Sequence, residues 1–261
     1  MGDKSIDKNI IQLGLAAEIA FCRAMATDCF ERDGILAITI GLHDPILNLV
    51  VDAQLSEEEL DENIQQVIAF FKQHNVIWNW VVGPLSKPAT LTKHLEQHGL
   101  VWQERFPGMH FDFLQNIPDS SIEYFKIIEV PAIEDLSVWS EALAEGFPTA
   151  DNATGYLQVN ANLPYGTGAA LRHYVGYYKK QVVSSVTLFI SDEAVMIHNL
   201  ATKTAFLKRG FGTAMTLHAM REAKKLRRQH CFLDASASGA SLYKRIGFQP
   251  YCYYDVYGLL D

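Results

Sequence analysis

The chain has 261 residues, of which 49% are hydrophobic and 20% charged, and its formal net charge is −8 at pH 7. This composition is typical of a globular protein with one large core or two smaller ones, and it excludes a disordered chain. The negative charge and the scattered basic residues argue against a nucleic-acid partner, because phosphate contacts need a positive surface. No apolar run approaches the length of a membrane span, and the charged first residues do not resemble a signal peptide. We therefore expect a cytoplasmic protein without a membrane partner.

The chain contains four cysteines, and none of them has the spacing of a metal-binding or redox pair. No Cys-x-x-Cys occurs, and no histidine pair stands near a cysteine to complete a ligand set. We therefore expect reduced thiols and no metal at Cys22, Cys29, Cys231 and Cys252.

The first half of the chain alternates strands and helices from about residue 35. Short apolar or alternating stretches predict strands, and two segments with helical periodicity predict helices. The predicted order is strand 35–42, strand 46–53, helix 57–74, strand 76–82, helix 89–98 and strand 101–114.

The second half repeats that order after an additional strand. The predicted elements are strands 171–178, 182–190 and 194–200, helix 212–228, strand 231–235, helix 238–246 and strand 251–259. Such an alternation, with a long helix behind each sheet, predicts an α/β layer fold in both halves. We place the seam near residues 116–121, which gives domains 1–118 and 122–261.

The long helix begins differently in the two halves. In the first half, residues 56–59 read Ser-Glu-Glu-Glu, which predicts a capping box in which Ser56 and Glu59 satisfy the free N–H groups. In the second half, Gly210 and Gly212 stand at the helix start with two cations before them. Because carboxylates at a helix start repel an anion, we expect an anion site in the second half only.

Residues 199–213 run from an apolar strand through a glycine-containing turn into an amphipathic helix. Gly210 and Gly212 leave backbone N–H groups uncovered at the positive helix end, where they can hold a phosphate. A dinucleotide fold needs a third glycine where Met215 stands, and a nucleotide P-loop needs Gly-Lys-Ser/Thr where Gly212 is followed by Thr213. For this segment alone, an ordinary strand-to-helix turn stays open.

A second motif stands downstream, where residues 235–248 read Ala-Ser-Ala-Ser-Gly-Ala-Ser-Leu-Tyr-Lys-Arg-Ile-Gly-Phe. With residues 200–212, this stretch resembles the GNAT acyl-CoA N-acyltransferases, whose motifs read roughly V-A-T-x-x-x-x-R-x-x-G-x-G and A-S-x-x-A/G-x-x-L-Y-x-R/K-x-G-F. The resemblance covers about residues 195–250. It departs from the family pattern at Leu207, where the family has Gln or Arg.

The resemblance implies an α/β (α+β) fold of two GNAT-like halves, each a mixed and mostly antiparallel sheet flanked by helices. The N-terminal half would be degenerate and the C-terminal half intact. It also implies acetyl-CoA as co-substrate, held by a strand edge and by the loop before the long helix, without a metal. The residues it assigns to cofactor binding are Leu200, Ala201, Thr202, Lys208, Arg209, Gly210, Phe211, Gly212, Thr213, Ser236 and Ser241.

The resemblance places Tyr243 where the family often keeps the acid that protonates the departing thiolate. A phenol with a pKa of about 10 is protonated at neutral pH and can donate. The family's strand glutamate is absent from residues 194–200, where His198 is the one side chain that titrates near neutral pH. We therefore consider His198 as the general base, and a packing role stays open for both residues.

We expect a small-molecule or peptide amine as the acceptor. The side chains that could seat a cationic amine lie in two connecting segments and are Phe147, Asp151, Tyr156 and Tyr165. The predicted function is an N-acetyltransferase that works by direct attack in a ternary complex, as a monomer or homodimer. Two alternatives stay open: a sensor or partner module that binds acyl-CoA without turnover, and a two-half aminoacyl or peptidoglycan-type acyltransferase.

Overall fold

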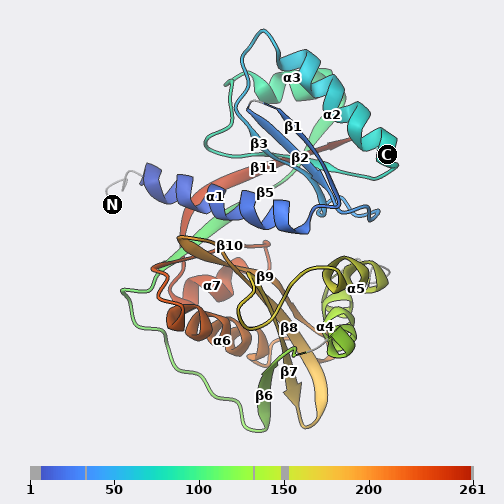
Figure 1. The fold of residues 1–261 in the computed structure, drawn as a ribbon. Helices are drawn as coiled ribbons and strands as arrows, with labels where there is room; N and C mark the ends of the chain where they lie inside the picture. Colours follow the sequence, from blue (N-terminus) through green and yellow to red (C-terminus); the bar gives the residue numbers. More distant parts are fainter. Residues whose placement is uncertain (1–6, 33, 132, 148–152, 260–261) are drawn as a thin grey trace. The chain divides into compact units, whose positions relative to one another are not determined.

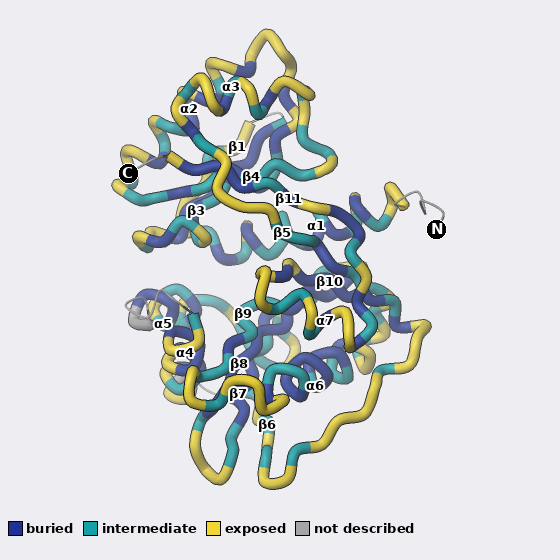
Figure 2. Tube along the Cα trace, turned by 180° about the vertical axis from the view of Figure 1, so that it is seen from behind, coloured by how far each residue is buried: buried dark blue, intermediate teal, exposed yellow. Residues whose placement is uncertain are grey.

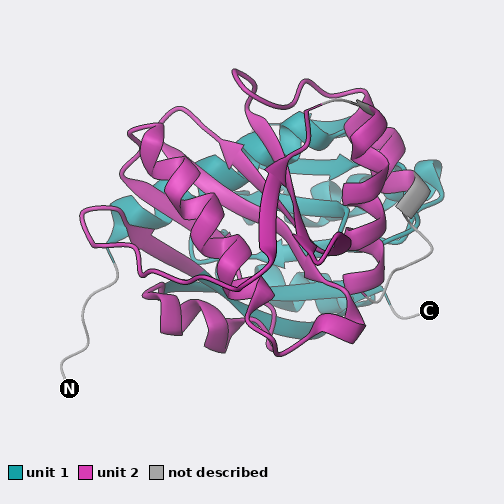
Figure 3. Cartoon of the chain, turned by 90° about the horizontal axis from the view of Figure 1, so that it is seen from below, with its two compact units in different colours: residues 1–108, 250–261 teal, residues 109–249 magenta. Residues whose placement is uncertain are grey.

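The computed structural model describes residues 7–32, 34–131, 133–147 and 153–259 (Figure 1). The chain forms two compact units (Figure 3): unit 1 comprises residues 1–108 and 250–261, and unit 2 comprises residues 109–249. Within the described ranges, no helix is long and apolar enough to cross a membrane.

Unit 1 combines a mixed sheet with helices. Its strands follow the order β1-β2-β3-β4-β11-β5. Strands β3 and β4 are parallel, whereas the pairs β1–β2, β2–β3 and β4–β11 are antiparallel. The elements are α1 (Lys8–Met25), β1 (Asp28–Arg32), β2 (Ile35–Thr39), β3 (Asn48–Ala53), α2 (Leu60–His74), β4 (Asn79–Val82), α3 (Leu91–Gln97), β5 (Leu100–Asp112) and β11 (Gln249–Leu259).

Helix α2 forms because its apolar residues recur at helical spacing on one face. Leu60, Ile64, Val67 and Phe71 are all fully buried. Each such burial stabilises the fold by about 1.5–3 kcal/mol relative to an exposed side chain. Phe71 also stacks on Trp78, with ring centroids 4.5 Å apart. This face fixes α2 within the core of unit 1.

The capping box predicted at the start of α2 is wrong. The helix begins at Leu60, and its N-cap residue Glu59 makes no side-chain hydrogen bond to the backbone. Instead, the Ser56 hydroxyl donates to Glu59 Oε2 at 2.8 Å, because an ionised carboxylate is a stronger acceptor than a neutral group. The first turn is nevertheless acidic, since it carries Asp61 and Glu62.

Unit 2 is a mostly antiparallel sheet flanked by helices. Its strands follow the order β10-β9-β8-β7-β6, with the end of β5 beside β10. Only β9 and β10 are parallel among the pairs described for these strands. The elements are β6 (Phe125–Glu129), α4 (Ile133–Gly146), α5 (Ala153–Ala161), β7 (Leu171–Tyr178), β8 (Gln181–Ile190), β9 (Ala194–Thr202), the 3₁₀ turn η2 (Thr204–Phe206), α6 (Phe211–Lys225), β10 (His230–Asp234) and α7 (Ala240–Ile246).

The two faces of this sheet have different neighbours, as the alternation of side chains along a strand requires. Tyr174 and Ile197 belong to the core that contains Met215 of α6. On the other face, His173 of β7 packs against Trp139 of α4, with ring centroids 4.4 Å apart. Figure 2 shows the resulting concentration of buried residues along β8 and β9.

The predicted fold class is confirmed, because mostly antiparallel sheet and flanking helices make up both units. Every predicted strand and helix has a counterpart in the structure, whereas α1, β1, β6, α4 and α5 were not predicted. Helix α4 could have been found from Leu136, Trp139 and Leu143, which recur at helical spacing. The domain bounds 1–118 and 122–261 stay a prediction, and the compact units differ from them because the last strand belongs to unit 1.

Three histidines of unit 2 have strongly lowered pKa values. Burial lowers the pKa of His173 and of His198 to about 3. Burial, with a smaller contribution from neighbouring His230, lowers the pKa of His110 to about 4. All three imidazoles are therefore neutral in the folded protein at neutral pH.

We expect the protein to lose stability as the pH falls from about 6.5 toward 3. The unfolded chain takes up protons at these histidines near pH 6.5, and the folded chain does so only at lower pH. The stabilisation that depends on these neutral histidines is complete above their pKa in the unfolded chain. It is lost as the pH falls toward their pKa in the folded chain. In His173→Asn, the pH dependence of the unfolding free energy from urea titrations should weaken by up to about 1.4 kcal/mol per pH unit. An unchanged slope would contradict burial of a neutral His173.

Candidate active site

Strands β9 and β10 pair over a short stretch and then separate. Their parallel register covers residues 194–196 of β9 and 230–232 of β10. Strand β9 continues to Thr202, and within the described chain no strand pairs with it on that edge beyond Met196. An unpaired edge presents backbone N–H and C=O groups that an extended ligand can bind by adding itself as a strand.

Strand β9 also contains a bulge where it leaves β10. Thr187 of β8 lies opposite His198, but Ser185 lies opposite Ala201, so that β9 has an additional residue here. Asn199 within the bulge has a φ of 52°, in the left-handed region that asparagine enters more readily than most residues. The backbone therefore changes direction at the point where the strand edge becomes free.

The loop after β9 ends in an uncapped helix start. Gly210 is the N-cap of α6, with a φ of 86° and no side-chain capping bond. Among the described residues, no acceptor faces the N–H groups of residues 208–213. No acidic residue stands in the first turn of α6, and Lys208 and Arg209 before it are exposed. The positive helix end and the cations make this the predicted anion site.

Arg209 lies over a group of aromatic rings. Its guanidinium carbon is 4.9 Å from the ring centroid of Tyr178, 5.2 Å from that of Phe206 and 5.3 Å from that of Phe211. Phe211 itself is 1% exposed. The side chain of Phe211 thus anchors the helix start in the core, and its contribution to ligand binding is restricted to its backbone.

The end of β9, the start of α6 and helix α7 meet at Gly212. A Cβ at Gly212 would lie 3.3 Å from Leu242 Cδ1 and 3.7 Å from Thr202 Oγ1. The structure therefore brings Thr202 of the predicted strand edge next to the predicted phosphate loop. A small residue is required here because the second motif packs directly against the first.

Helix α4 closes against the end of β9. A Cβ at Gly146 would lie 2.7 Å from Ala201 Cβ, so the helix can approach this closely only with glycine. Lys203 Nζ forms ion pairs with Glu141 Oε1 at 2.7 Å and Glu145 Oε2 at 3.0 Å. Burial lowers the pKa of Lys203, but hydrogen bonds with both glutamates outweigh it and raise the pKa overall. These ion pairs could not be expected from the sequence, because α4 was not among the predicted helices.

The two predicted serines take part in local hydrogen bonds. Ser236 Oγ accepts from the Gly239 N–H at 3.2 Å, before the start of α7. Ser241 Oγ accepts from the Arg245 guanidinium at 3.4 Å, one turn along the helix. Both side chains are exposed, and their roles in cofactor binding stay predictions.

Tyr243 lies on α7, which follows β10. It is 8% exposed and belongs to the core of unit 2, with its ring 5.9 Å from that of Phe248. Burial raises the pKa of Tyr243, so its hydroxyl keeps its proton at neutral pH. This state suits a general acid, and the acid role stays a prediction.

His198 is partly buried on β9, directly before the bulge. With a pKa lowered to about 3, its imidazole is a weak proton acceptor at neutral pH. This counts against the base role predicted for it. Asp192 and Glu193, the carboxylates nearest to β9 in the sequence, precede the strand at its opposite end.

The predicted acceptor contacts are only partly described. Tyr156 is 3% exposed within α5, and Phe147 and Tyr165 are partly buried. Asp151 lies outside the described residues. Tyr165 packs against His173 with ring centroids 5.4 Å apart, which places it on the α4 side of the sheet.

Two parallel strands of unit 1, β3 and β4, also separate after a short paired stretch. Here residues 83–87 bond to the edge of β3 that β4 leaves. Strands β3 and β4 pair only at Leu49–Asn79 and Val50–Trp80. Residues 83–87 leave β4, form a turn and come back beside the end of β3, where Lys87 forms a parallel bridge with Gln54. The Lys87 N–H donates to the Ala53 carbonyl at 2.8 Å, and the Leu55 N–H donates to the Lys87 carbonyl at 3.2 Å.

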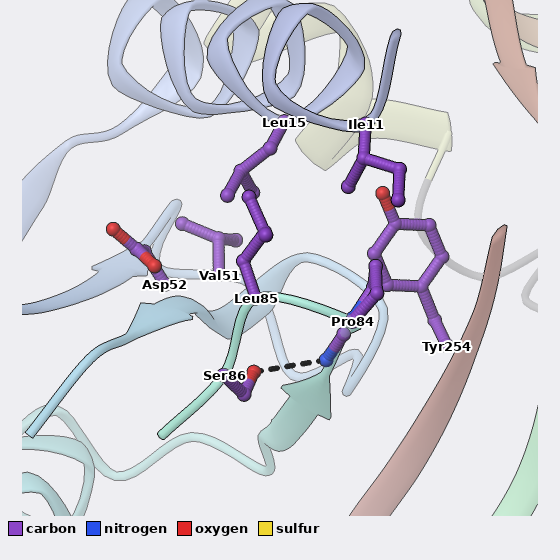
Figure 4. A pocket seen from close by; sticks show the side chains of 9 residues that line it. Ile11, Leu15, Val51, Asp52, Pro84, Leu85, Ser86 and Tyr254 are labelled. Carbon is purple, nitrogen blue, oxygen red and sulfur yellow. Dashed lines mark hydrogen bonds between the residues drawn. The ribbon is translucent and has the colours of Figure 1, made fainter. Parts of the chain in front are cut away.

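Side chains of the returning segment fill the space beside β3. Figure 4 shows Leu85 in a small pocket with Leu15 of α1 and Val51 of β3. The Gly83 N–H donates to Ser86 Oγ at 2.9 Å, which fixes the turn. In unit 1 residues 83–87 therefore satisfy the strand edge, while in unit 2 no described strand pairs with the corresponding edge of β9 beyond Met196.

The separated strands, the bulge and the open helix start define a GNAT fold. Residues 169–250 match the family model described as an acetyltransferase (GNAT) domain. No curated protein sequence matches the chain.

Solved structures agree with this fold over nearly the whole chain. A GCN5-related N-acetyltransferase from Kribbella flavida is 16% identical, with a TM-score of 0.74 over 95% of this chain and 97% of that one. One from Sphaerobacter thermophilus is 16% identical, with a TM-score of 0.63 over 86% and 76%. A tandem GNAT protein from the clavulanic acid biosynthesis pathway is 9% identical, with a TM-score of 0.61 over 86% and 77%. At these identities the likeness concerns the fold alone.

We expect one CoA to bind per chain. In unit 1, residues 83–87 already occupy the strand edge and acidic residues stand in the first turn of α2. Calorimetric titration with CoA should therefore give a stoichiometry of one. The comparison variant is Gly210→Ala, which alters the site in unit 2 only and should weaken all of the CoA binding. Two equivalents, or a site that keeps the parent affinity in that variant, would contradict the asymmetry.

Proposed function

We propose that the protein transfers an acetyl group from acetyl-CoA to a primary amine by direct attack in a ternary complex. The family match of residues 169–250 supports an acyltransferase. The observation that carries the proposal is the free edge of β9 beside an uncapped, cation-flanked helix start. The edge of β9 can pair with the extended pantetheine arm of CoA, and the start of α6 can hold the pyrophosphate of CoA.

The reaction needs an electrophilic thioester and a donor for the carbonyl oxygen as it becomes an oxyanion. We assign that donor to the backbone of β9 at Leu200 and its neighbours, which lie within or beside the bulge and beyond the last residue that pairs with β10. Fixed backbone donors act most strongly on the charge that develops in the transition state. No covalent enzyme intermediate is required.

The departing thiolate needs a proton, for which Tyr243 is our candidate. The raised pKa of Tyr243 keeps its phenol protonated at neutral pH, so that it has a proton to donate. The departing CoA thiolate is the base that accepts it, with the basicity of an ordinary thiolate. Tyr243 would give its proton to the sulfur as the carbon–sulfur bond breaks and regain one from solvent. The proton lost by the attacking nitrogen goes to water.

The amine must arrive uncharged, and the described residues of β9 offer no carboxylate to deprotonate it. His198 has too low a pKa to be efficient in this role. We therefore propose that the acceptor binds in its neutral form or loses its proton to water. On this account the rate rises with pH up to the pKa of the free amine.

A second candidate is a sensor or partner module that binds acyl-CoA without turnover. The observation that favours it is the weak basicity of His198 on a strand without a carboxylate. The two candidates share the binding site and differ in whether any amine is acetylated. The first experiment below tests the binding site that they share, and the second separates them by measuring turnover.

The first experiment tests the binding site with a pair of glycines that share one backbone conformation. Gly210 and Gly99 both have a φ of 86°, and only Gly210 stands at the proposed pyrophosphate loop. Replacement by alanine strains either position by about 1–2 kcal/mol. We expect Gly210→Ala to weaken CoA binding at least tenfold in calorimetry, whereas Gly99→Ala keeps the parent affinity. Equal affinities in the two variants would reject the site.

The second experiment tests the acid with a pair of buried tyrosines in the same core. Tyr243→Phe keeps the ring and removes the donor, so kcat should fall by about 10²–10⁴-fold while CoA affinity is unchanged. Tyr174→Phe removes a hydroxyl elsewhere in the core of unit 2 and should leave kcat near the parent value. Rates are measured as CoA release with a panel of amines. A parent protein that binds CoA and acetylates no amine would instead favour the sensor.

A further inference from the structure

The bulge of β9 is held by a side-chain connection across three strands. Asn199 Nδ2 is 3.4 Å from Thr187 Oγ1, and Thr187 Oγ1 is 2.9 Å from His173 Nδ1. An amide N–H can only donate, so Thr187 accepts from Asn199 and is free to donate its own proton to His173. The three residues come from β9, β8 and β7.

The far end of this connection is rigidly enclosed. His173 and Thr187 are both fully buried. The His173 ring packs against two aromatic rings, those of Trp139 at 4.4 Å and Tyr165 at 5.4 Å between centroids. A neutral imidazole whose Nδ1 accepts from Thr187 carries its proton on Nε2, and that atom is buried without a partner among the described residues. The burial of both residues and their hydrogen bond restrict the position of the Thr187 hydroxyl.

The near end is the conformationally unusual one. Asn199 has a φ of 52°, and a left-handed residue within a strand is stable only when its surroundings hold it. Its backbone conformation sets the direction of the peptide groups that follow, up to Ala201, where pairing with β8 resumes. These are the peptide groups that the proposed function assigns to the thioester carbonyl.

We propose that Asn199 is a positioning residue, tied through Thr187 to His173, which fixes the backbone of the β9 bulge for the transition state of acetyl transfer. This inference rests on the proposed function. An oxyanion donor that is fixed in advance acts on the transition state and little on the bound ground state. Loss of the connection should therefore lower kcat and leave the affinity for acetyl-CoA unchanged.

The test uses isosteric changes at Thr187. Thr187→Val keeps the shape and removes the hydroxyl, and we expect kcat to fall about tenfold or more with the acetyl-CoA Kd within twofold. Thr187→Ser restores the hydroxyl and should recover most of kcat. Ser185→Ala is the matched control, since Ser185 is a buried hydroxyl on the same strand without a partner among the described residues. A Thr187→Val enzyme with the kcat of the Ser185→Ala control would overturn the proposal.

A double-mutant cycle shows whether Asn199 and Thr187 act through the same hydrogen bond or independently. Asn199→Gly accepts the left-handed backbone and loses the amide, so it should lower kcat as Thr187→Val does. If both act through the same bond, the double variant should be no slower than the slower single variant. Multiplication of the two effects would contradict the connection.

A readout that does not depend on turnover separates this inference from the proposed function. In Thr187→Val, the backbone amide resonances of residues 199–201 should shift in NMR spectra, whereas those of the control should coincide with the parent protein. Unchanged resonances would overturn the positioning role, even in an active enzyme. Shifted resonances in a protein that acetylates no amine would support the positioning of the bulge and reject the proposed function.

Discussion

The structure depends on one constraint: two parallel strands that separate must leave backbone hydrogen-bonding groups that something else satisfies. Unit 1 satisfies its edge internally, because residues 83–87 return and bond to Ala53 and Leu55. Unit 2 keeps the corresponding edge of β9 free of a partner strand in the described chain. Unpaired backbone groups are costly when buried and useful when a ligand can reach them, and this difference is the basis on which we propose a site in unit 2 only.

Electrostatics favours the same assignment independently of strand geometry. The first turn of α2 carries Asp61 and Glu62, and an anion placed there would meet like charge. The first turn of α6 carries no acidic residue, and Arg209 before it is held over aromatic rings. A helix start attracts anions only where its own side chains have not already neutralised it. The two helix starts therefore differ in charge although they occupy equivalent places in the chain order.

The features that sequence could predict are local, and those that it could not depend on distant residues. Gly210 and Tyr243 could be predicted as site residues because each lies in a motif that is continuous in the chain, and their roles stay predictions. The capping box at Ser56 was mispredicted because its hydroxyl has a carboxylate as a competing partner. The bulge at Asn199 depends on pairing with β8, and the closure by residues 83–87 depends on β3. Neither leaves a signal in the spacing of residues along the chain.

The last strand has a consequence for how the chain can be divided. Strand β11 is the final element of the second repeat, yet it pairs with β4 in unit 1, with Asp255 opposite Val82. A cut at the seam near residue 120 would leave each fragment without a strand that completes a sheet, and exposed sheet edges promote aggregation. The repeats are thus interdependent as folding units. Because β11 completes the sheet of unit 1, the N-terminal half depends for its fold on the end of the chain whether or not it binds a ligand.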